Sequence, residues 1–327
     1  MKKVIAVVFV LALLFSAVSC RRSDTVVIRI ANNVPDDHPQ SIVLADFKEI
    51  FESKTDGRFD VQIFNNNLLG TAEVYTDLLI RGTIQMALPG QIIAQNYPLA
   101  AWSSAPFLFR DWEHFRSVAF SDIVTDIYRD MPQAIGVRHF GQIPSGFRVV
   151  LSRVPIQSFD DFSGLRLRVP NIAVYIAFAQ GIGASAITMA LSELFSALEQ
   201  GVVDAAENTY ATLLTMRYHE IAPYLVETNH IFNTISFLVN EGFWQSLSSE
   251  DQRLMQASID EAILRGWDNA LASEREFMRR MQEEGATIFT PDAEFRQRLI
   301  DSQEEARRIF FNDYPGTEPF VRRIMEM

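Results

Sequence analysis

The stretch GLRLRVPN (residues 164–171) places two arginines in a segment that otherwise has the pattern of a buried strand. Side chains two residues apart on a strand point to the same face, so Arg166 and Arg168 share a face. Arg168 stands at the carboxyl end of this strand, where open α/β sheets gather their ligands. A guanidinium there can hold a carboxylate with two parallel hydrogen bonds. We therefore interpret Arg168 as a ligand-binding residue and Arg166 as a solvent-facing arginine on an exposed edge strand.

The composition of the whole chain is that of a large globular protein. It has 327 residues, of which 48% are hydrophobic and 21% charged, and this length suits two domains better than one. The formal net charge is -12 and the pI is about 4.9. Nucleic-acid partners are not expected, because they require a basic face. A small anion is still compatible with this charge, because a local arginine can act against the global sign.

The first residues have the pattern of a secretory signal peptide, which we assign to residues 1–19. Lys2 and Lys3 precede the apolar run 4–15, which is too short for a membrane-spanning helix. Ala17-Val-Ser-Cys20 resembles a bacterial lipobox, so we expect Cys20 to be lipidated and to become the first mature residue. The alternative is an ordinary signal peptide next to a stray cysteine. In both cases the mature protein lies outside the cytoplasm, and it has no disulfide because Cys20 is the only cysteine.

Strands and helices alternate over the rest of the chain, which predicts an α/β fold with a mainly parallel sheet. The expected strands cover residues 25–31, 58–64, 84–88, 147–152, 165–169 and 202–205. The expected helices cover residues 41–51, 72–80, 173–180, 191–200, 249–284, 293–312 and 317–327. The long helix begins after the capping residues Ser248 and Ser249. We expect two α/β lobes that are joined by several crossings of the chain.

Motifs for catalysis, metal binding or cofactor binding are absent from the pattern. The five histidines are scattered, and His219-Glu220 lacks the second histidine of a zinc helix. Gly181 to Ala186 matches a loose dinucleotide fingerprint, but it follows a helical run rather than a strand, so a glycine turn is the better interpretation. We therefore expect no enzyme, no metal and no cofactor.

Residues 145–233 resemble the solute-binding proteins of TRAP (tripartite ATP-independent periplasmic) transporters of the DctP-like family. The matching segments are Pro155-Ile156, Gly164 to Pro170, Gly183-Ala184, Met189 to Glu193, Ala197 to Asp204, Glu207-Asn208 and Thr228 to His230. Weaker similarity extends over nearly all of the mature chain. It includes His38-Pro39, Leu69-Gly70 and Gly82-Thr83.

The resemblance implies an extracytoplasmic binding protein with a two-lobed periplasmic-binding-protein fold, a hinge and long C-terminal helices. The lobes would close over an organic carboxylate and deliver it to the two membrane subunits of a permease that is driven by an ion gradient. In the family, the arginine before Val-Pro forms the main salt bridge to the ligand, and here it is Arg168. The other residues that the resemblance assigns to the ligand site are Arg148, Asn208, Asn171, Asn33 and Leu191.

The same resemblance suggests how the chain is divided. Lobe I is expected to comprise residues 20–146 together with about 234–273. Lobe II is expected to comprise residues 147–233 together with about 274–300. Residues 301–327 are expected to form C-terminal helices that pack on the lobes.

Three positions depart from relatives that bind polar sugar acids. Ala72 stands where those relatives often carry an acidic residue, Leu191 replaces a frequent phenylalanine, and the stretch 87–90 lacks the usual polar groups. These changes leave the expected carboxylate site in place. They favour a monocarboxylate with an apolar body.

Two other functions remain open at this stage. A binding protein of an ATP-driven importer has the same general architecture, and the neighbouring permease genes would distinguish it. A sensory or scaffolding lipoprotein that has lost transport is the second alternative, and the Arg168 and Asn208 pair argues against it.

The lipoprotein assignment predicts that the mature protein partitions into the detergent phase. Replacement of Cys20→Ser should release the protein or leave the signal peptide uncleaved, because no thiol remains to accept the lipid. Detergent-phase partitioning followed by mass spectrometry of the N-terminus measures both effects. A wild-type protein that is unlipidated and stays in the aqueous phase would contradict the assignment.

Overall fold

In the computed structural model, which describes residues 25–327, the longest strand is β4 (Val137–Ser152), and it belongs to two sheets. Its first part, up to Phe147, pairs antiparallel with β9 (Phe232–Asn240). From Arg148 onward it pairs antiparallel with β7 (Ala205–Thr209) and with β8 (Tyr224–Val226). This change of partners, between Phe147 and Arg148, divides the protein into two lobes.

Lobe I is built on the strands β2-β1-β3-β9 and the first part of β4, and lobe II on the second part of β4 with β7-β5-β6, β8 and β10. Strands β1, β2 and β3 are parallel, as the alternation of strands and helices predicts. The remaining strands are β1 (Val26–Ala31), β2 (Phe59–Phe64), β3 (Met86–Ala87), β5 (Arg166–Val169), β6 (Ser185–Thr188) and β10 (Thr287–Phe289).

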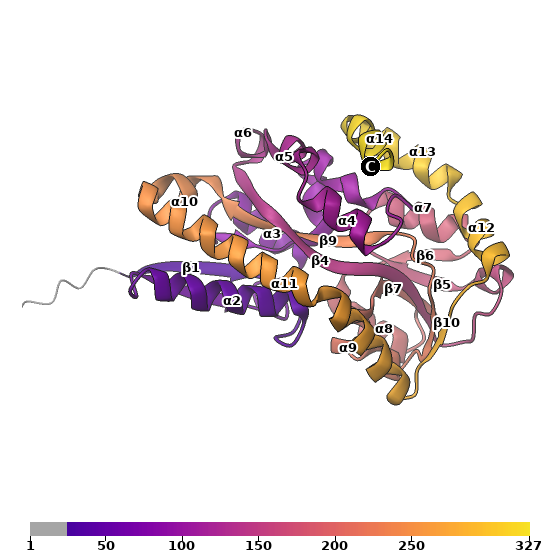
Figure 1. Cartoon of the computed structure of the whole chain (residues 1–327). Coiled ribbons are helices and arrows are strands. Elements are labelled where there is room, and N and C mark those ends of the chain that lie inside the picture. The colour runs from indigo at the N-terminus through magenta and orange to yellow at the C-terminus, as the bar shows by residue number, and fades with distance from the viewer. Residues whose placement is uncertain (1–24) are drawn as a thin grey trace, which may run out of the picture.

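Helices cover the sheets of both lobes (Figure 1). The α-helices are α2 (Pro39–Lys54), α3 (Ala72–Ile80), α4 (Trp112–Ala119), α5 (Asp122–Tyr128), α6 (Met131–Ile135), α7 (Ala173–Gly181), α8 (Leu194–Glu199), α9 (Tyr210–Thr215), α10 (Glu241–Ser246), α11 (Ser249–Glu283), α12 (Ala293–Asp301), α13 (Glu304–Asp313) and α14 (Glu318–Met325). The 3-10 helices are η1 (Gly90–Gln95), η2 (Pro98–Ser104), η3 (Phe159–Phe162), η4 (Leu191–Glu193), η5 (Tyr218–Glu220) and η6 (Pro315–Thr317). Residues 1–19 and Cys20 lie outside the described residues.

Besides β4 and the segment between β8 and β9, two helical segments connect the lobes. Helix α11 begins after Ser248, whose hydroxyl accepts a hydrogen bond from Asp251 N, and it packs on α2 of lobe I and on α9 of lobe II. In Figure 1 it runs from beside α10 in lobe I to below α9 in lobe II. The C-terminal segment packs through α13 on α7 of lobe II and through α14 on α5 of lobe I. The helix expected over 293–312 is interrupted at Ser302 and Gln303, where the chain passes close to α7: a Cβ on Gly181 would lie 2.5 Å from Ser302 O.

Two expectations about lobe II were wrong in detail. The strand expected over 202–205 begins only at Ala205, because residues 201–204 form the turn after α8. Arg166 is not on an edge strand, since β5 lies between β7 and β6. Its guanidinium is half exposed and pairs with Asp204, with Nε 2.8 Å from Oδ2.

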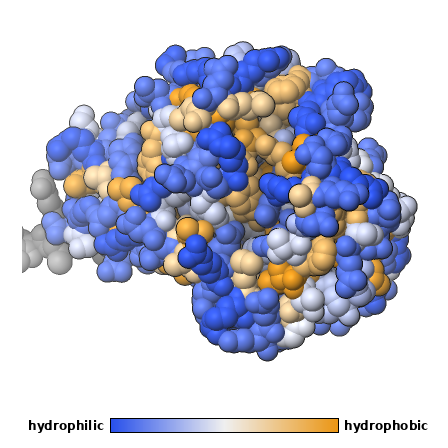
Figure 2. All heavy atoms as spheres, turned by 45° about the vertical axis from the view of Figure 1, so that its right-hand side comes forward, coloured by the Kyte–Doolittle hydropathy of each residue, from blue (hydrophilic) through white to orange (hydrophobic). Residues whose placement is uncertain are grey.

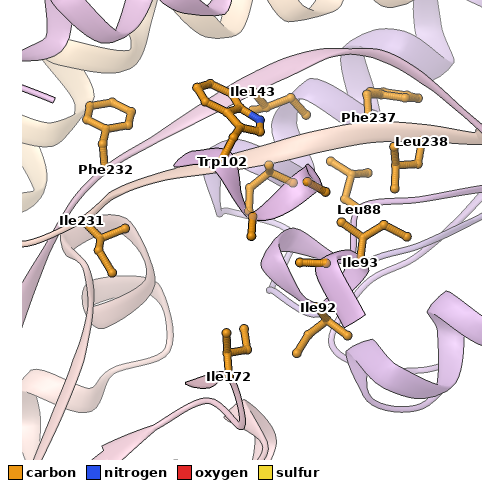
Figure 3. Packing of buried hydrophobic residues seen from close by; sticks show 14 of the residues in the cluster. Leu88, Ile92, Ile93, Trp102, Ile143, Ile172, Ile231, Phe232, Phe237 and Leu238 are labelled. Atoms are coloured by element: carbon orange, nitrogen blue, oxygen red, sulfur yellow. The ribbon is translucent and has the colours of Figure 1, made fainter. Parts of the chain in front are cut away.

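One buried cluster of hydrophobic side chains extends from lobe I into lobe II. It includes Leu88, Ile92 and Trp102 of lobe I, Phe232 and Phe237 of β9, and Ile172 of lobe II (Figure 3). A second cluster lies in lobe II beneath α8, α9 and the end of α11. The face in Figure 2 is largely hydrophilic, with hydrophobic residues gathered in its middle. Among residues 25–327, no helix combines the length and the apolarity that a membrane span requires.

Glu274 of α11 lies beside the point where β4 changes lobes. Its Oε2 accepts a hydrogen bond from Trp112 Nε1 at 2.7 Å. Its Oε1 occupies the space that a side chain at residue 146 would fill: a Cβ on Gly146 would lie 2.6 Å from this oxygen, and the φ of Gly146 is +100°. Burial raises the pKa of Glu274 to about 7.

The raised pKa of Glu274 predicts a pH-dependent cost to stability. The folded protein keeps this proton up to about pH 7, whereas the unfolded chain releases it above about 4.5, so stability falls as the pH rises through this range. Glu274→Gln should remove the cost and raise the free energy of unfolding at pH 8 by up to about 3 kcal/mol. At pH 4 the variant should match the wild type. Urea titrations at both pH values measure this, and an equal effect at the two values would contradict it.

Candidate ligand-binding site

A cavity of about 320 Å³ lies between the two lobes. Its wall contains all six residues that the sequence assigned to ligand binding: Arg168, Arg148, Asn208, Asn171, Asn33 and Leu191. Strand β7 brings three of them together, because it lies between β4 and β5 in the sheet. Position 149 of β4 is the register partner of Asn208, and Arg168 is the register partner of Ala206. Arg148, Asn208 and Arg168, which are 20 to 60 positions apart in the chain, therefore lie on three neighbouring strands with Asn208 on the middle one.

Arg168 is a buried cation, with 3% of the residue exposed. Its Nε and Nη2 donate to the backbone oxygen of Met189 at 3.1 and 2.7 Å. Burial lowers the pKa of Arg168 to about 10, which still leaves the group charged at neutral pH. No carboxylate of residues 25–327 lies within 4.0 Å of its guanidinium nitrogens. Its charge is thus compensated only by carbonyl dipoles and by more distant groups.

Arg148 is equally buried but already has a carboxylate partner, Glu207. Nη2 donates to Glu207 Oε1 at 2.8 Å and to the Glu207 backbone oxygen at 3.0 Å, and Nε donates to Oε2. Nη1 donates to Asn233 Oδ1 at 3.3 Å, and the guanidinium carbon lies 5.0 Å from the centre of the Tyr175 ring. Burial alone would lower the pKa of Arg148, but the Glu207 carboxylate outweighs it and raises this pKa. The Arg148 and Glu207 pair is therefore close to neutral as a unit.

His230 holds the carboxylate of Glu207 from the other side. Its Nε2 lies 3.3 Å from Glu207 Oε2, and its Nδ1 lies 2.8 Å from Thr228 Oγ1. The ring stacks on Phe178, with centroids 3.7 Å apart. Burial lowers the pKa of His230, so the ring is neutral, and the tautomer that serves Glu207 carries its proton on Nε2. The segments 207–208 and 228–230, which carried the family resemblance, thus meet behind Arg148.

Asn208 presents a hydrogen-bond donor to the cavity. Its Oδ1 accepts a hydrogen bond from Thr209 N at 2.9 Å, which fixes the orientation of the amide. Among residues 25–327 no acceptor pairs with its Nδ2. The amide is therefore available for a ligand oxygen near Arg168.

The remaining three predicted residues line the cavity from different elements. Asn33 follows β1, and its backbone oxygen accepts from Asn67 Nδ2 at 3.2 Å. The backbone oxygen of Asn171 accepts from Gln95 Nε2 of lobe I at 3.2 Å, which makes a contact between the lobes. Leu191 opens η4, and its backbone oxygen accepts from the hydroxyl of Tyr218 at 3.0 Å. Their side chains are available to the cavity.

Sequence reasoning missed most of the polar side chains in the wall. Those from lobe I include Gln40, Asn67, Thr71, Glu73 and Gln91, and those from lobe II include Tyr175, Thr188 and Ser192. Ala72, Gly90 and Leu191 do line the cavity as expected, but polar residues adjoin each of them. Glu73 stands one position after the site where an acidic residue was sought, in the first turn of α3. Inspection of that whole turn would have found it.

One group of potential metal ligands occurs in the described part of the chain, outside the cleft. His219, Glu220 and Glu284 bring ligand atoms within 4.8 Å of one another. Glu284 Oε2 lies 2.8 Å from His219 Nε2, and Glu220 is paired with Arg217. Glu284 and Glu220 thus each have a partner within the protein.

The contrast between the two arginines predicts opposite effects on stability. Arg148→Ala should lower the free energy of unfolding by about 3–5 kcal/mol, because it leaves Glu207 buried without its partner. Arg168→Ala should leave stability unchanged or slightly higher, because a buried charge without a carboxylate partner is removed. Denaturant titrations of the ligand-free variants measure both. As a control, Arg148→Met combined with Glu207→Leu should recover most of the loss. Equal destabilisation by the two alanine variants would contradict the assignment.

The chain is similar to known solute-binding proteins. Residues 30–313 match the family described as DctP, bacterial extracellular solute-binding protein, family 7. A Vibrio cholerae protein named sialic acid-binding periplasmic protein SiaP is 30% identical over 231 residues, which are 70% of each chain.

Two solved structures of TRAP periplasmic solute-binding proteins are also similar. One, from Haemophilus influenzae with bound L-gulonate, has a TM-score of 0.88 and 28% identity, and the match covers 92% of this chain and 99% of that one. The other, from Desulfovibrio desulfuricans with bound sn-glycerol-3-phosphate, has a TM-score of 0.87 and 26% identity, with coverages of 91% and 96%. The chain is therefore a binding protein rather than an enzyme, and it belongs to the DctP family of TRAP transporter solute-binding proteins.

Proposed function

We propose that the protein binds a sugar acid in the cleft between its lobes, with the ligand carboxylate on Arg168. The observation that carries the proposal is the buried charge of Arg168, which has no carboxylate partner among residues 25–327. A cation in such a place is costly unless an anion pairs with it, and a carboxylate can do so with two hydrogen bonds. Asn208 would donate a further hydrogen bond to the same group. Arg148 makes most of its hydrogen bonds to Glu207, so the net positive charge available to the ligand is that of Arg168.

The polar wall of lobe I supports a ligand body that carries several hydroxyl groups. Gln40, Asn67 and Glu73 supply amide and carboxylate groups that can donate to and accept from hydroxyls. The similar protein from Haemophilus influenzae holds L-gulonate, a ligand of this class. We therefore propose a sugar acid in place of the apolar monocarboxylate that Ala72 and Leu191 suggested.

Capture would proceed by closure of the lobes. Asn33 and Asn171 line the cavity from opposite lobes, so a ligand between them would stabilise the closed arrangement through contacts with both. The loaded protein would deliver the acid to the two membrane subunits of a TRAP permease that is driven by an ion gradient. Lipidation of Cys20 would hold it at the membrane outside the cytoplasm.

Calorimetric titration with L-gulonate, D-glucuronate, sn-glycerol 3-phosphate and hexanoate tests the ligand class. We expect binding of a sugar acid and none of hexanoate. Arg168→Ala should weaken binding of that acid by about 30-fold to several thousand-fold, which corresponds to about 2–5 kcal/mol. Arg168→Lys should also weaken it, because an ammonium cannot make the forked contact.

Arg166→Ala is the matched control, because Arg166 lies on the same strand and is paired with Asp204. It should leave the Kd unchanged within about twofold. Normal binding by Arg168→Ala would contradict the proposed role of Arg168. Binding of hexanoate or of the phosphate ester, with no response to either sugar acid, would contradict the proposed ligand class.

A further inference from the structure

A buried hydrogen bond joins the two lobes beside the cleft. His38 precedes α2 of lobe I, and its Nε2 lies 3.3 Å from Thr212 Oγ1 on α9 of lobe II. The two residues are 1% and 4% exposed. This contact and the more exposed one between Gln95 and Asn171 both bridge the lobes. We refer to the His38 and Thr212 pair as the inter-lobe contact.

The surroundings of His38 fix the position of its proton. Nδ1 accepts a hydrogen bond from Gln40 N at 3.1 Å and thereby caps the N-terminus of α2. Nδ1 is therefore unprotonated, and Nε2 carries the hydrogen that is donated to Thr212 Oγ1. A second proton would have to lie on Nδ1, directly opposite the Gln40 N–H. The inter-lobe contact is thus compatible only with a neutral ring.

The inter-lobe contact continues to the wall of the ligand cavity. Thr212 Oγ1 lies 3.3 Å from Thr209 Oγ1, which lies 3.4 Å from Ser145 Oγ on β4. Thr212 and Ser145 line the ligand cavity. His38 lines a second cavity of about 320 Å³ that Ser145 also borders. The contact therefore separates the ligand cavity from the second cavity, at the place where β4 passes between the lobes.

We propose that His38 is a positioning residue that holds the lobes closed over the ligand through Thr212, and that it does so only while its imidazole is neutral. The ligand part of this proposal rests on the proposed binding function. His38 touches no ligand-cavity surface itself, so it acts through the position of lobe II. Loss of its neutral form should weaken ligand binding without any change at Arg168.

The pH dependence follows from the difference between closed and open lobes. In the closed arrangement burial lowers the pKa of His38 to about 3, and opening would expose the ring and return its pKa towards about 6.5. The closed form therefore binds fewer protons, so closure weakens as the pH falls below about 6.5, by up to about tenfold per pH unit. The ligand carboxylate, with an ordinary pKa of about 4, stays ionised above pH 5.

The effect of pH on His38 has to be distinguished from its effect on the other charged groups nearby. Asp37 adjoins it in the chain, Asp46 faces the same second cavity from α2, and Arg265 and Glu274 face this cavity from α11. Burial alone accounts for the lowered pKa of His38. Glu274 titrates near pH 7, so the measurements are made in a Glu274→Gln background as well as in the wild type.

The first test measures the Kd of the sugar acid that binds best in the panel, from pH 8 to pH 5. His38→Asn keeps a residue that caps helices well but is too short to reach Thr212. It should weaken binding at pH 8 by about fivefold, the effect of one net hydrogen bond, and remove the decline in affinity towards pH 5. Thr212→Val should weaken binding similarly while keeping the decline, because the buried imidazole remains. The double variant should be no weaker than the weaker single variant. Identical pH profiles for the wild type and His38→Asn would overturn the proposal.

The second test needs no ligand and so distinguishes failure of this proposal from failure of the proposed function. Nitroxide labels at Glu49→Cys on α2 and Glu199→Cys on α8, both exposed, report the distance between the lobes in a Cys20→Ser background. Pulsed electron spin resonance at pH 8 should give a larger short-distance population for the wild type than for His38→Asn. That population should fall towards pH 5 in the wild type alone. Equal populations at pH 8 would overturn the proposal even if a sugar acid binds.

Discussion

The unpaired charge of Arg168 is the constraint around which lobe II is organised. Two guanidinium groups are buried close to each other on β4 and β5, and only Arg148 has a carboxylate within ion-pair distance in the described chain. The carboxylate of Glu207 is held by His230 as well as by Arg148. The protein thereby retains one charge that an incoming anion can compensate. A ligand carboxylate that pairs with Arg168 would supply the counter-charge that no carboxylate of residues 25–327 provides.

The topology explains how the site is assembled and why it lies where the lobes meet. Arg148 is the first residue of β4 that pairs with lobe II, so its side chain enters the cleft beside the crossing point. Gly146, two residues earlier, has a left-handed backbone and borders Glu274 of α11. The inter-lobe contact of His38 and Thr212 lies in the same region. The charge site, the crossing strand and the contact between lobes are therefore parts of one connected structure.

The sequence predicted the parts of the fold that depend on local pattern. The alternation of strands and helices, the long helix after Ser248 and the position of Arg168 near the end of its strand are all present. Properties that depend on long-range pairing were not predictable. The order β7-β5-β6 makes β5 an inner strand and gives Arg166 the partner Asp204, and nothing near residue 166 in the chain indicates this order. The pairing of Arg148 with Glu207 likewise follows from the register of β4 and β7, and the break at residues 302–303 follows from the close approach to α7.

A crystal structure of the protein with bound L-gulonate tests the central claim most directly. The account predicts both carboxylate oxygens of the ligand within hydrogen-bond distance of the Arg168 guanidinium, with Asn208 Nδ2 on one of them and the Arg148 and Glu207 pair intact. A carboxylate that displaces Glu207 from Arg148, or that lies away from Arg168 with a hydroxyl end in its place, would contradict it.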